Sequence, residues 1–95
     1  MTKHTPGPWR YDYADGYCGE IIASNGKSVC SFTDEPNESD AHLIAGAVDL
    51  LESLIQTHGL LEATLLVIND SEARAIIKQQ LDANRAAVAK AEGRA

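Results

Sequence analysis

The sequence is poor in the residues on which several classes of function depend. Its 95 residues include two cysteines, five Phe, Trp or Tyr residues, and eight lysines or arginines against fourteen acidic residues. Binding to a nucleic-acid duplex needs many cationic contacts with phosphate, so a net charge of −6 argues against that partner. No apolar run approaches the roughly 18 residues of a transmembrane helix, and the N-terminus does not resemble a signal peptide. We therefore expect a cytoplasmic protein that forms a single domain over residues 1–95.

The residues of common catalytic and metal sites are few and scattered. None of His4, His42 and His58 stands beside a serine or cysteine in an arrangement typical of nucleophilic catalysis. The histidines and cysteines lack the spacing of metal ligands, and no glycine-rich phosphate-binding loop is present. The sequence therefore predicts a protein that is not an enzyme and has no cofactor or metal site.

The clearest pattern in the sequence predicts an amphipathic helix over residues 37–58. Asn37 can cap its start, acidic residues follow in the first turn, and Gly59 can end it. The apolar residues recur at helical spacing and form one stripe that must be buried. These residues are Leu43, Ile44, Ala47, Val48, Leu51, Leu54 and Ile55.

Residues 60–92 predict a second helix, which Gly93 ends. Asn69 and Glu72 have the spacing of a capping box, so this helix can kink at residues 69–71. Apolar residues nevertheless continue at rough helical spacing across that point, which favours one long helix. The alternative is a fourth strand over the apolar residues 65–68.

The N-terminal third predicts a β-meander. Residues 1–8 contain two prolines and form an extended lead-in, and alternating polar and apolar residues predict three strands within residues 9–33. Asp15-Gly16 and Asn25-Gly26 are typical of two-residue hairpin turns, the latter of type I′. The predicted fold class is therefore α+β: a three-stranded antiparallel β-meander followed by two α-helices in a helix hairpin.

The two turns also predict how the strands pair. Trp9, Tyr11 and Tyr13 share one face, and Arg10 points to the other. Both faces hold apolar residues, so we expect one face to pack on the helices and the other to be covered by a second subunit or a ligand. The predicted cross-strand pairs include Trp9–Ile22, Tyr11–Glu20, Ile21–Cys30 and Ile22–Val29.

The same register places the two cysteines on opposite faces of the sheet. Cys18 and Cys30 are then not cross-strand neighbours, and a disulfide bond would need a different register. Together with a cytoplasmic location, this predicts two free thiols.

Three segments carry a resemblance to known proteins. The opening 4–9 (HTPGPW), the segment 40–52 (DAHLIAGAVDLLE) and the tail 85–93 (RAAVAKAEG) resemble a large group of small phage and prophage accessory proteins. Those proteins open with HTPGPW and carry a helix like NARLIAAAPDLLEAL, so this chain departs at His42, where arginine is usual, and at Val48, where proline is usual. The resemblance implies no single activity, but it implies a phage setting in which inhibitors of host defence are common.

The predicted architecture is also similar to that of the Tad1-type phage proteins, by analogy of shape alone. Those proteins assemble as oligomers and sequester nucleotide immune signals. The analogy implies a homo-oligomer, a dimer or a higher even number, with a ligand such as a cyclic nucleotide or an ADP-ribose derivative.

The aromatic row on the first strand is the candidate binding site. Trp9, Tyr11 and Tyr13 can stack on a base, and Arg10 and Lys27 can reach a phosphate. We therefore expect an anti-defence phage protein that sequesters a nucleotide in the cytoplasm of the infected bacterium. The aromatic residues can equally be core that packs beneath the helices. Two other functions stay open: an acidic protein-binding inhibitor of a host defence complex, similar to an anti-CRISPR protein, and a structural accessory protein without a ligand.

Overall fold

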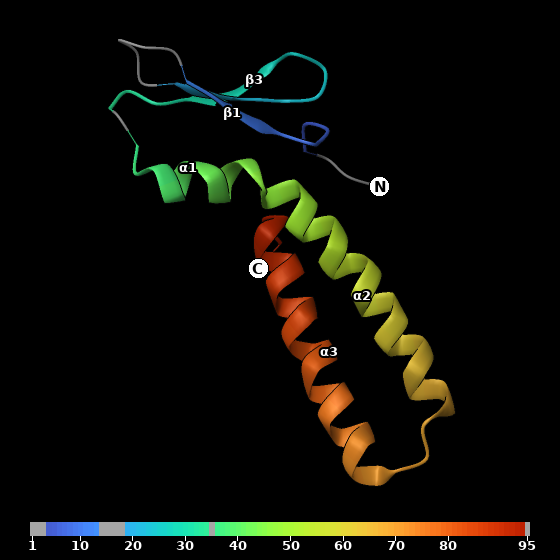
Figure 1. The fold of residues 1–95 in the computed structure, drawn as a ribbon. Helices are drawn as coiled ribbons and strands as arrows, with labels where there is room; N and C mark the ends of the chain where they lie inside the picture. The colour runs from blue at the N-terminus through green and yellow to red at the C-terminus, as the bar shows by residue number, and fades with distance from the viewer. Residues whose placement is uncertain (1–3, 14–18, 35, 95) are drawn as a thin grey trace. The chain divides into compact units, whose positions relative to one another are not determined.

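The computed structural model describes residues 4–13, 19–34 and 36–94 and has the predicted α+β fold (Figure 1). The chain divides into two compact units, the sheet unit (residues 1–50) and the hairpin unit (residues 51–95). Single-domain organisation stays a prediction. The elements are β1 (Arg10–Asp12), β2 (Glu20–Ile22), β3 (Ser28–Ser31), α1 (Glu38–Ala45), α2 (Ala47–Val67) and α3 (Ser71–Ala91).

The sheet is antiparallel with strand order β1-β2-β3, as predicted, but the predicted register between β1 and β2 is wrong by one residue. The observed pairs are Arg10–Ile22, Tyr11–Ile21 and Asp12–Glu20. This register places Tyr11 beside Ile21, which is fully buried. Because of this slip, Tyr11 shares a face of the sheet with Ile21 and not, as predicted, with Ile22. The predicted turn at Asp15-Gly16 lies outside the described residues.

Strands β2 and β3 confirm one predicted pair and correct another. Ile21 pairs with Cys30, but a β-bulge follows, and Ile22 pairs with Ser28 instead of Val29. The turn has positive φ at Gly26 alone, whereas a type I′ turn needs positive φ at Asn25 as well. Cys30 is a free, exposed thiol. Cys18 lies outside the described residues.

The core of the sheet unit lies around β2 and the helix that follows the sheet. Strands β1 and β2 contact α1, whose Ala41 is fully buried. Ile21 and Ile22 are neighbours in one strand, yet both are buried within this chain. The sheet therefore does not need a second subunit to cover Ile22.

The predicted helix break at Gly59 is wrong, and the helices divide at Gly46 instead. Asn37 caps α1 as predicted, and its side chain accepts hydrogen bonds from the N–H groups of Ser39 and Asp40. Gly46 ends α1, and α2 begins one residue later. Gly59 lies inside α2, where a Cβ atom would meet nothing within 4 Å. An exposed helical glycine costs only about 1 kcal/mol, so the apolar residues around Gly59 keep the helix continuous.

A break separates α2 from α3 at residues 68–70, where the sequence predicted a kink, and no strand forms at residues 65–67. Asp70, and not Asn69, occupies the N-cap of α3. Arg74 bridges the break, because its Nη1 donates to the carbonyl oxygens of Leu65 and Ile68 (2.9 Å to Ile68). These bonds satisfy carbonyl groups that the end of a helix leaves without partners.

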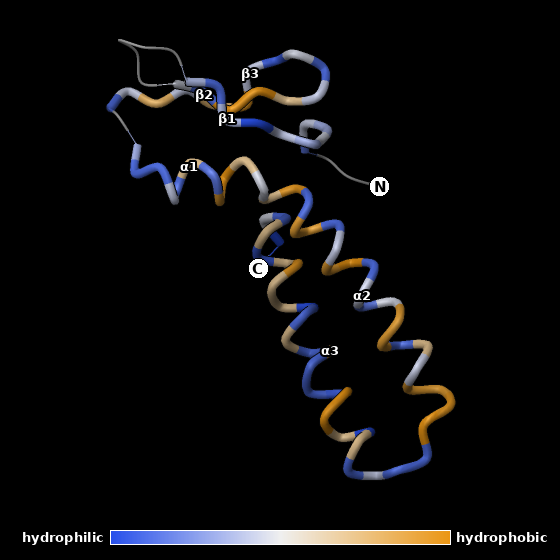
Figure 2. The backbone as a smooth tube through the Cα atoms, in the orientation of Figure 1, coloured by the Kyte–Doolittle hydropathy of each residue, from blue (hydrophilic) through white to orange (hydrophobic). Residues whose placement is uncertain are grey.

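The hairpin unit packs residues 51–67 of α2 alongside α3 in antiparallel directions (Figure 1). Its buried residues are Leu81 and Asn84 of α3, whereas large apolar side chains of α2 stay exposed. The tube in Figure 2 is strongly hydrophobic toward the end of α2 and mostly polar along α3. Among the described helices, none has the combination of length and hydropathy needed to span a membrane.

Candidate functional site

The structure does not bring the five predicted binding residues together. Trp9 is half-buried against the lead-in: its Nε1 donates to the carbonyl oxygen of Thr5 at 3.1 Å, and its ring meets His4 edge-on at 6.3 Å. Through these contacts the Trp9 indole holds the lead-in on the strand. Trp9 therefore has a structural role in the sheet unit.

The two predicted phosphate contacts lie on the two edges of the sheet, since Arg10 is in β1 and Lys27 directly precedes β3. Arg10 forms an exposed ion pair with Asp12, with 3.6 Å between the charged atoms. Lys27 lies in the turn between β2 and β3, where its backbone N–H donates to Oδ1 of Asn25. Neither of the two basic residues belongs to the lining of the hollow that contains Tyr11 and Tyr13.

Tyr11 is the packing centre of the aromatic row. Its ring lies 6.0 Å from the rings of Phe32 and His42, and 6.1 Å from Tyr13. A Cβ atom on Gly19 would lie 2.8 Å from the Tyr11 ring, so only glycine fits there. Tyr11 therefore supports the contact between the sheet and α1, as the core interpretation of the row expects.

A hollow of about 430 Å³ lies where β1 meets the start of α1, and we call it the acidic hollow. Its size is within the usual range of small-molecule and side-chain pockets. Two of its residues, Tyr11 and Tyr13, belong to the predicted site. The full lining is Tyr11, Asp12, Tyr13, Pro36, Glu38 and His42.

The charges around this hollow are opposite to those predicted. Asp12 and Glu38 contribute carboxylates, whose negative charge repels the negative charge of a phosphate group. Asp12 is already paired with Arg10, whereas Glu38 lies 3.6 Å from Nε2 of His42. Glu38 is thus the carboxylate that an incoming cation reaches without displacing an arginine. Aromatic rings beside a carboxylate are a chemical match for an ammonium or guanidinium group.

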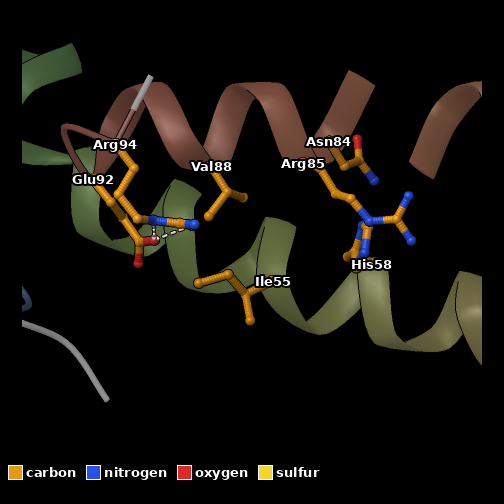
Figure 3. Close-up of a pocket in the computed structure, with 7 residues that line it drawn as sticks. All are labelled: Ile55, His58, Asn84, Arg85, Val88, Glu92 and Arg94. Carbon is orange, nitrogen blue, oxygen red and sulfur yellow. Dashed lines mark hydrogen bonds and ion pairs between the residues drawn. The ribbon is translucent and has the colours of Figure 1, made fainter. Parts of the chain in front are cut away.

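A second hollow of about 380 Å³ lies between α2 and α3 in the hairpin unit (Figure 3). Ile55 and Val88 point toward one another and form its apolar part. Polar groups surround them, including the two basic residues Arg85 and Arg94. The lining is Ile55, His58, Asn84, Arg85, Val88, Glu92 and Arg94.

The polar groups of this second hollow are largely paired within the chain. Nη1 of Arg85 donates to Oδ1 of Asp82 at 3.1 Å, and Arg94 donates to Glu92. Nδ1 of His58 is buried and has no hydrogen-bond partner among the residues that the structure describes. An anion would therefore have to compete with carboxylates for both arginines.

Sequence reasoning missed Pro36, Glu38 and His42 as neighbours of the aromatic row. They follow the sheet in the chain, and only the contact of α1 with β1 brings them to the tyrosines. The sequence carried one relevant signal, the acidic first turn of the predicted helix. Among the described residues, no group of three or more His, Cys, Asp or Glu side chains could hold a metal ion.

Comparisons with known proteins assign the chain to a protein family. No curated protein and no solved structure matches it. A family model does match, and the match extends over residues 1–95. This finding confirms the expectation of a phage protein. The chain belongs to the family described as Salmonella phage P22 protein Y8K6.

Proposed function

We propose that this phage protein acts without catalysis, by binding a basic surface of a host protein through the acidic hollow. The observation that supports the proposal is the lining itself: two tyrosine rings and two carboxylates around one cavity. A lysine or arginine side chain of the partner enters this cavity. The proposed location is the cytoplasm of the infected bacterium, where an inhibitor of a host defence complex acts.

The physical basis of this binding is cation recognition. A guanidinium group over a tyrosine face gains about 0.5–2 kcal/mol, and a charge-assisted bond to a carboxylate adds to this. Tyr13 is 45% exposed, so part of its side chain faces the solvent. The net charge of −6 attracts a basic partner from a distance and raises the association rate. Proteins that bind nucleic acid present such basic surfaces, which makes a host defence nuclease complex a suitable class of partner.

Binding of a fluorescent octa-arginine peptide to the purified protein tests the proposal. Removing the charge of Glu38 (Glu38→Gln) should weaken binding about tenfold, because a charge-assisted contact contributes roughly 1.5–3 kcal/mol when it is well formed. Asp40→Asn is the matched control, since Asp40 lies in the same first turn of α1 but does not line the hollow. Equal losses in the two variants would mean nonspecific attraction to an acidic protein and would refute the role of the hollow.

Tyr13→Ala gives an independent test of the same hollow. The side chain is 45% exposed, so its removal should lower the melting temperature less than removal of Tyr11 does, while it weakens peptide binding several-fold. Tyr11→Ala is the less informative variant, because Tyr11 packs against Phe32 and His42. A Tyr13→Ala protein that binds the peptide normally would contradict the proposal.

Sequestration of a nucleotide is the second candidate function. Its proposed site is the hollow of the hairpin unit and not the aromatic row of the sheet. The supporting observation is that Arg85 and Arg94 flank an apolar surface made by Ile55 and Val88. A thermal-shift screen with cyclic dinucleotides and ADP-ribose derivatives tests it. A ligand at 100 times its Kd should stabilise the protein by about 2.7 kcal/mol. Arg85→Gln should abolish the shift, and Lys78→Gln, on the same helix but outside the hollow, should preserve it.

A further inference from the structure

His42 and Glu38 lie one helical turn apart on α1 and form an ion pair at the acidic hollow. Nε2 of His42 lies 3.6 Å from Oε1 of Glu38. Both residues line the hollow, and their side chains are 65% and 85% exposed. The carboxylate that the proposed function assigns to an incoming cation therefore has a competitor for it within the chain.

The charge of this competitor depends on pH. A neutral imidazole carries no net charge, whereas an imidazolium ion pairs with a carboxylate and repels other cations. Imidazole changes between these forms within about pH 5–8, and carboxylate, phenol and guanidinium groups ordinarily change charge outside this range. Among the described lining residues, His42 is thus the one whose class of side chain changes charge near neutral pH.

Contact with β1 places the His42 ring beside the aromatic side chains of the hollow. It meets the Tyr11 ring edge-on, with 6.0 Å between the ring centroids and 84° between the planes. Tyr13 lies next, with its ring centroid 6.1 Å from that of Tyr11. A positive charge on His42 therefore lies close to the rings that the proposed function assigns to the cation, and like charges repel.

The other charged groups near His42 come from α1 and the two strands that α1 contacts. Asp12 of β1 lines the hollow and is paired with Arg10 at 3.6 Å. Glu20 of β2 is the cross-strand partner of Asp12 and does not belong to the lining. Asp40 lies in the first turn of α1, also outside the lining. These groups are carboxylates and a guanidinium, so a change of charge near neutral pH is expected from the imidazole first.

We propose that His42 makes the acidic hollow pH-sensitive, because its protonated form competes with a basic partner for Glu38. This inference rests on the proposed function, since it needs a hollow that binds a cation. At low pH the imidazolium pairs with Glu38 and repels the partner, so affinity is low. At high pH the imidazole is neutral and Glu38 is available to the partner, so affinity is high. Linkage requires the reciprocal effect: binding of the partner releases protons from the protein.

Binding of the fluorescent octa-arginine peptide at about pH 6 and about pH 8, at constant ionic strength, tests the proposal. The wild-type chain should bind about two- to fivefold more tightly at the higher pH, the range that an exposed ion pair supports. His42→Gln should remove this dependence. His42→Arg, which carries a permanent positive charge, should bind weakly at both pH values.

Asp40→Asn is the matched control for the change in charge. Like His42→Arg, it makes the net charge more positive by one, but at a residue outside the lining. It should therefore keep the pH dependence of the wild-type chain. Circular dichroism of each variant checks that the helices are retained.

Proton release gives a second readout that does not depend on comparing affinities. Titration calorimetry near neutral pH, in two buffers with different ionisation enthalpies, should show proton release on binding in the wild-type chain and none in His42→Gln. His4, His58 and the amino terminus stay in that variant. A pH dependence or proton release that persists there would overturn the proposal, because another group would then be its source.

A wild-type affinity that is equal at the two pH values would also overturn the proposal. Failure of the proposed function gives a different result. In that case Glu38→Gln and Asp40→Asn would bind the peptide equally at about pH 8, where His42 does not compete. Binding that depends on Glu38 at this pH, but shows no response to His42, would leave the function in place and refute its regulation.

Discussion

The sheet unit and the hairpin unit bury their apolar residues to very different degrees. In the sheet unit, Ile21 and Ala41 are fully buried and Val48 is 3% exposed. In the hairpin unit, Leu66 is 86% exposed and Val67 is 75% exposed, although this stretch is the most apolar in the chain. The buried core is therefore concentrated in the sheet unit, and the end of α2 leaves its apolar side chains exposed. The difference shows that the hydrophobic residues of one small protein can be buried to very different degrees in two regions.

The sharpest test of this comparison pairs a truncation in each unit. Ile21→Ala should lower the free energy of unfolding by about 2–5 kcal/mol, because it leaves a cavity in a closed core. Leu66→Ala should change it by no more than about 0.5 kcal/mol, because the side chain is already in water. Urea unfolding of the two variants measures both values. Similar losses would show that the hairpin unit is as well packed as the sheet unit.

A smaller effect is expected from Arg74, which holds the end of the hairpin unit by polar contacts. Arg74→Met keeps much of the side-chain volume but removes the hydrogen bonds to the Leu65 and Ile68 carbonyls. We expect a loss of about 1–2 kcal/mol, since hydrogen bonds from a charged group contribute more than neutral ones. Lys78→Met on the same helix is the control. If the two variants have equal melting temperatures, the Arg74 bonds do not stabilise the hairpin.

The smallest effect concerns the start of α1 in the sheet unit. Asn37→Ala removes the side-chain oxygen that accepts hydrogen bonds from Ser39 and Asp40, and it should cost about 1 kcal/mol. For a chain of this length the melting temperature should fall by about 4–8 °C. Asn37→Gly should cost only a few tenths of a kcal/mol. A fall of the same size in both variants would indicate that backbone conformation, and not the cap, decides the effect.

The sequence predicted the order of elements well and their boundaries less well. Helical periodicity identified the two helical stretches, but the apolar stripe continues across both Gly46 and Gly59. Periodicity alone could not show which glycine divides the helices. The strand register failed for a related reason: Ile21 and Ile22 are both apolar, so alternation does not say which of them faces α1. Contacts between elements decide both points, and no local pattern contains them.

The candidate site was predicted in part. Tyr11 and Tyr13 do line a hollow, but the charged groups beside them are Asp12 and Glu38 in place of Arg10 and Lys27. Adjacent residues in a strand alternate between faces, which already separated Arg10 from the tyrosines. Glu38 comes from a distant part of the sequence, and its position depends on how α1 packs on β1. The sign of the charge around a site thus depended on tertiary structure.

The contact between Gly7 and Val48 links two stretches that are far apart in the chain. A Cβ atom on Gly7 would lie 2.6 Å from Cγ1 of Val48. Position 7 therefore has no room for a side chain larger than that of glycine while valine occupies position 48. The two positions therefore share one fixed volume, and a larger residue at either one requires a smaller residue at the other. Val48 is also the position at which the resemblance described in the sequence analysis leads us to expect proline. The opening segment and the first turn of α2 should accordingly evolve as a coupled pair, with substitutions at one site conditional on the residue at the other.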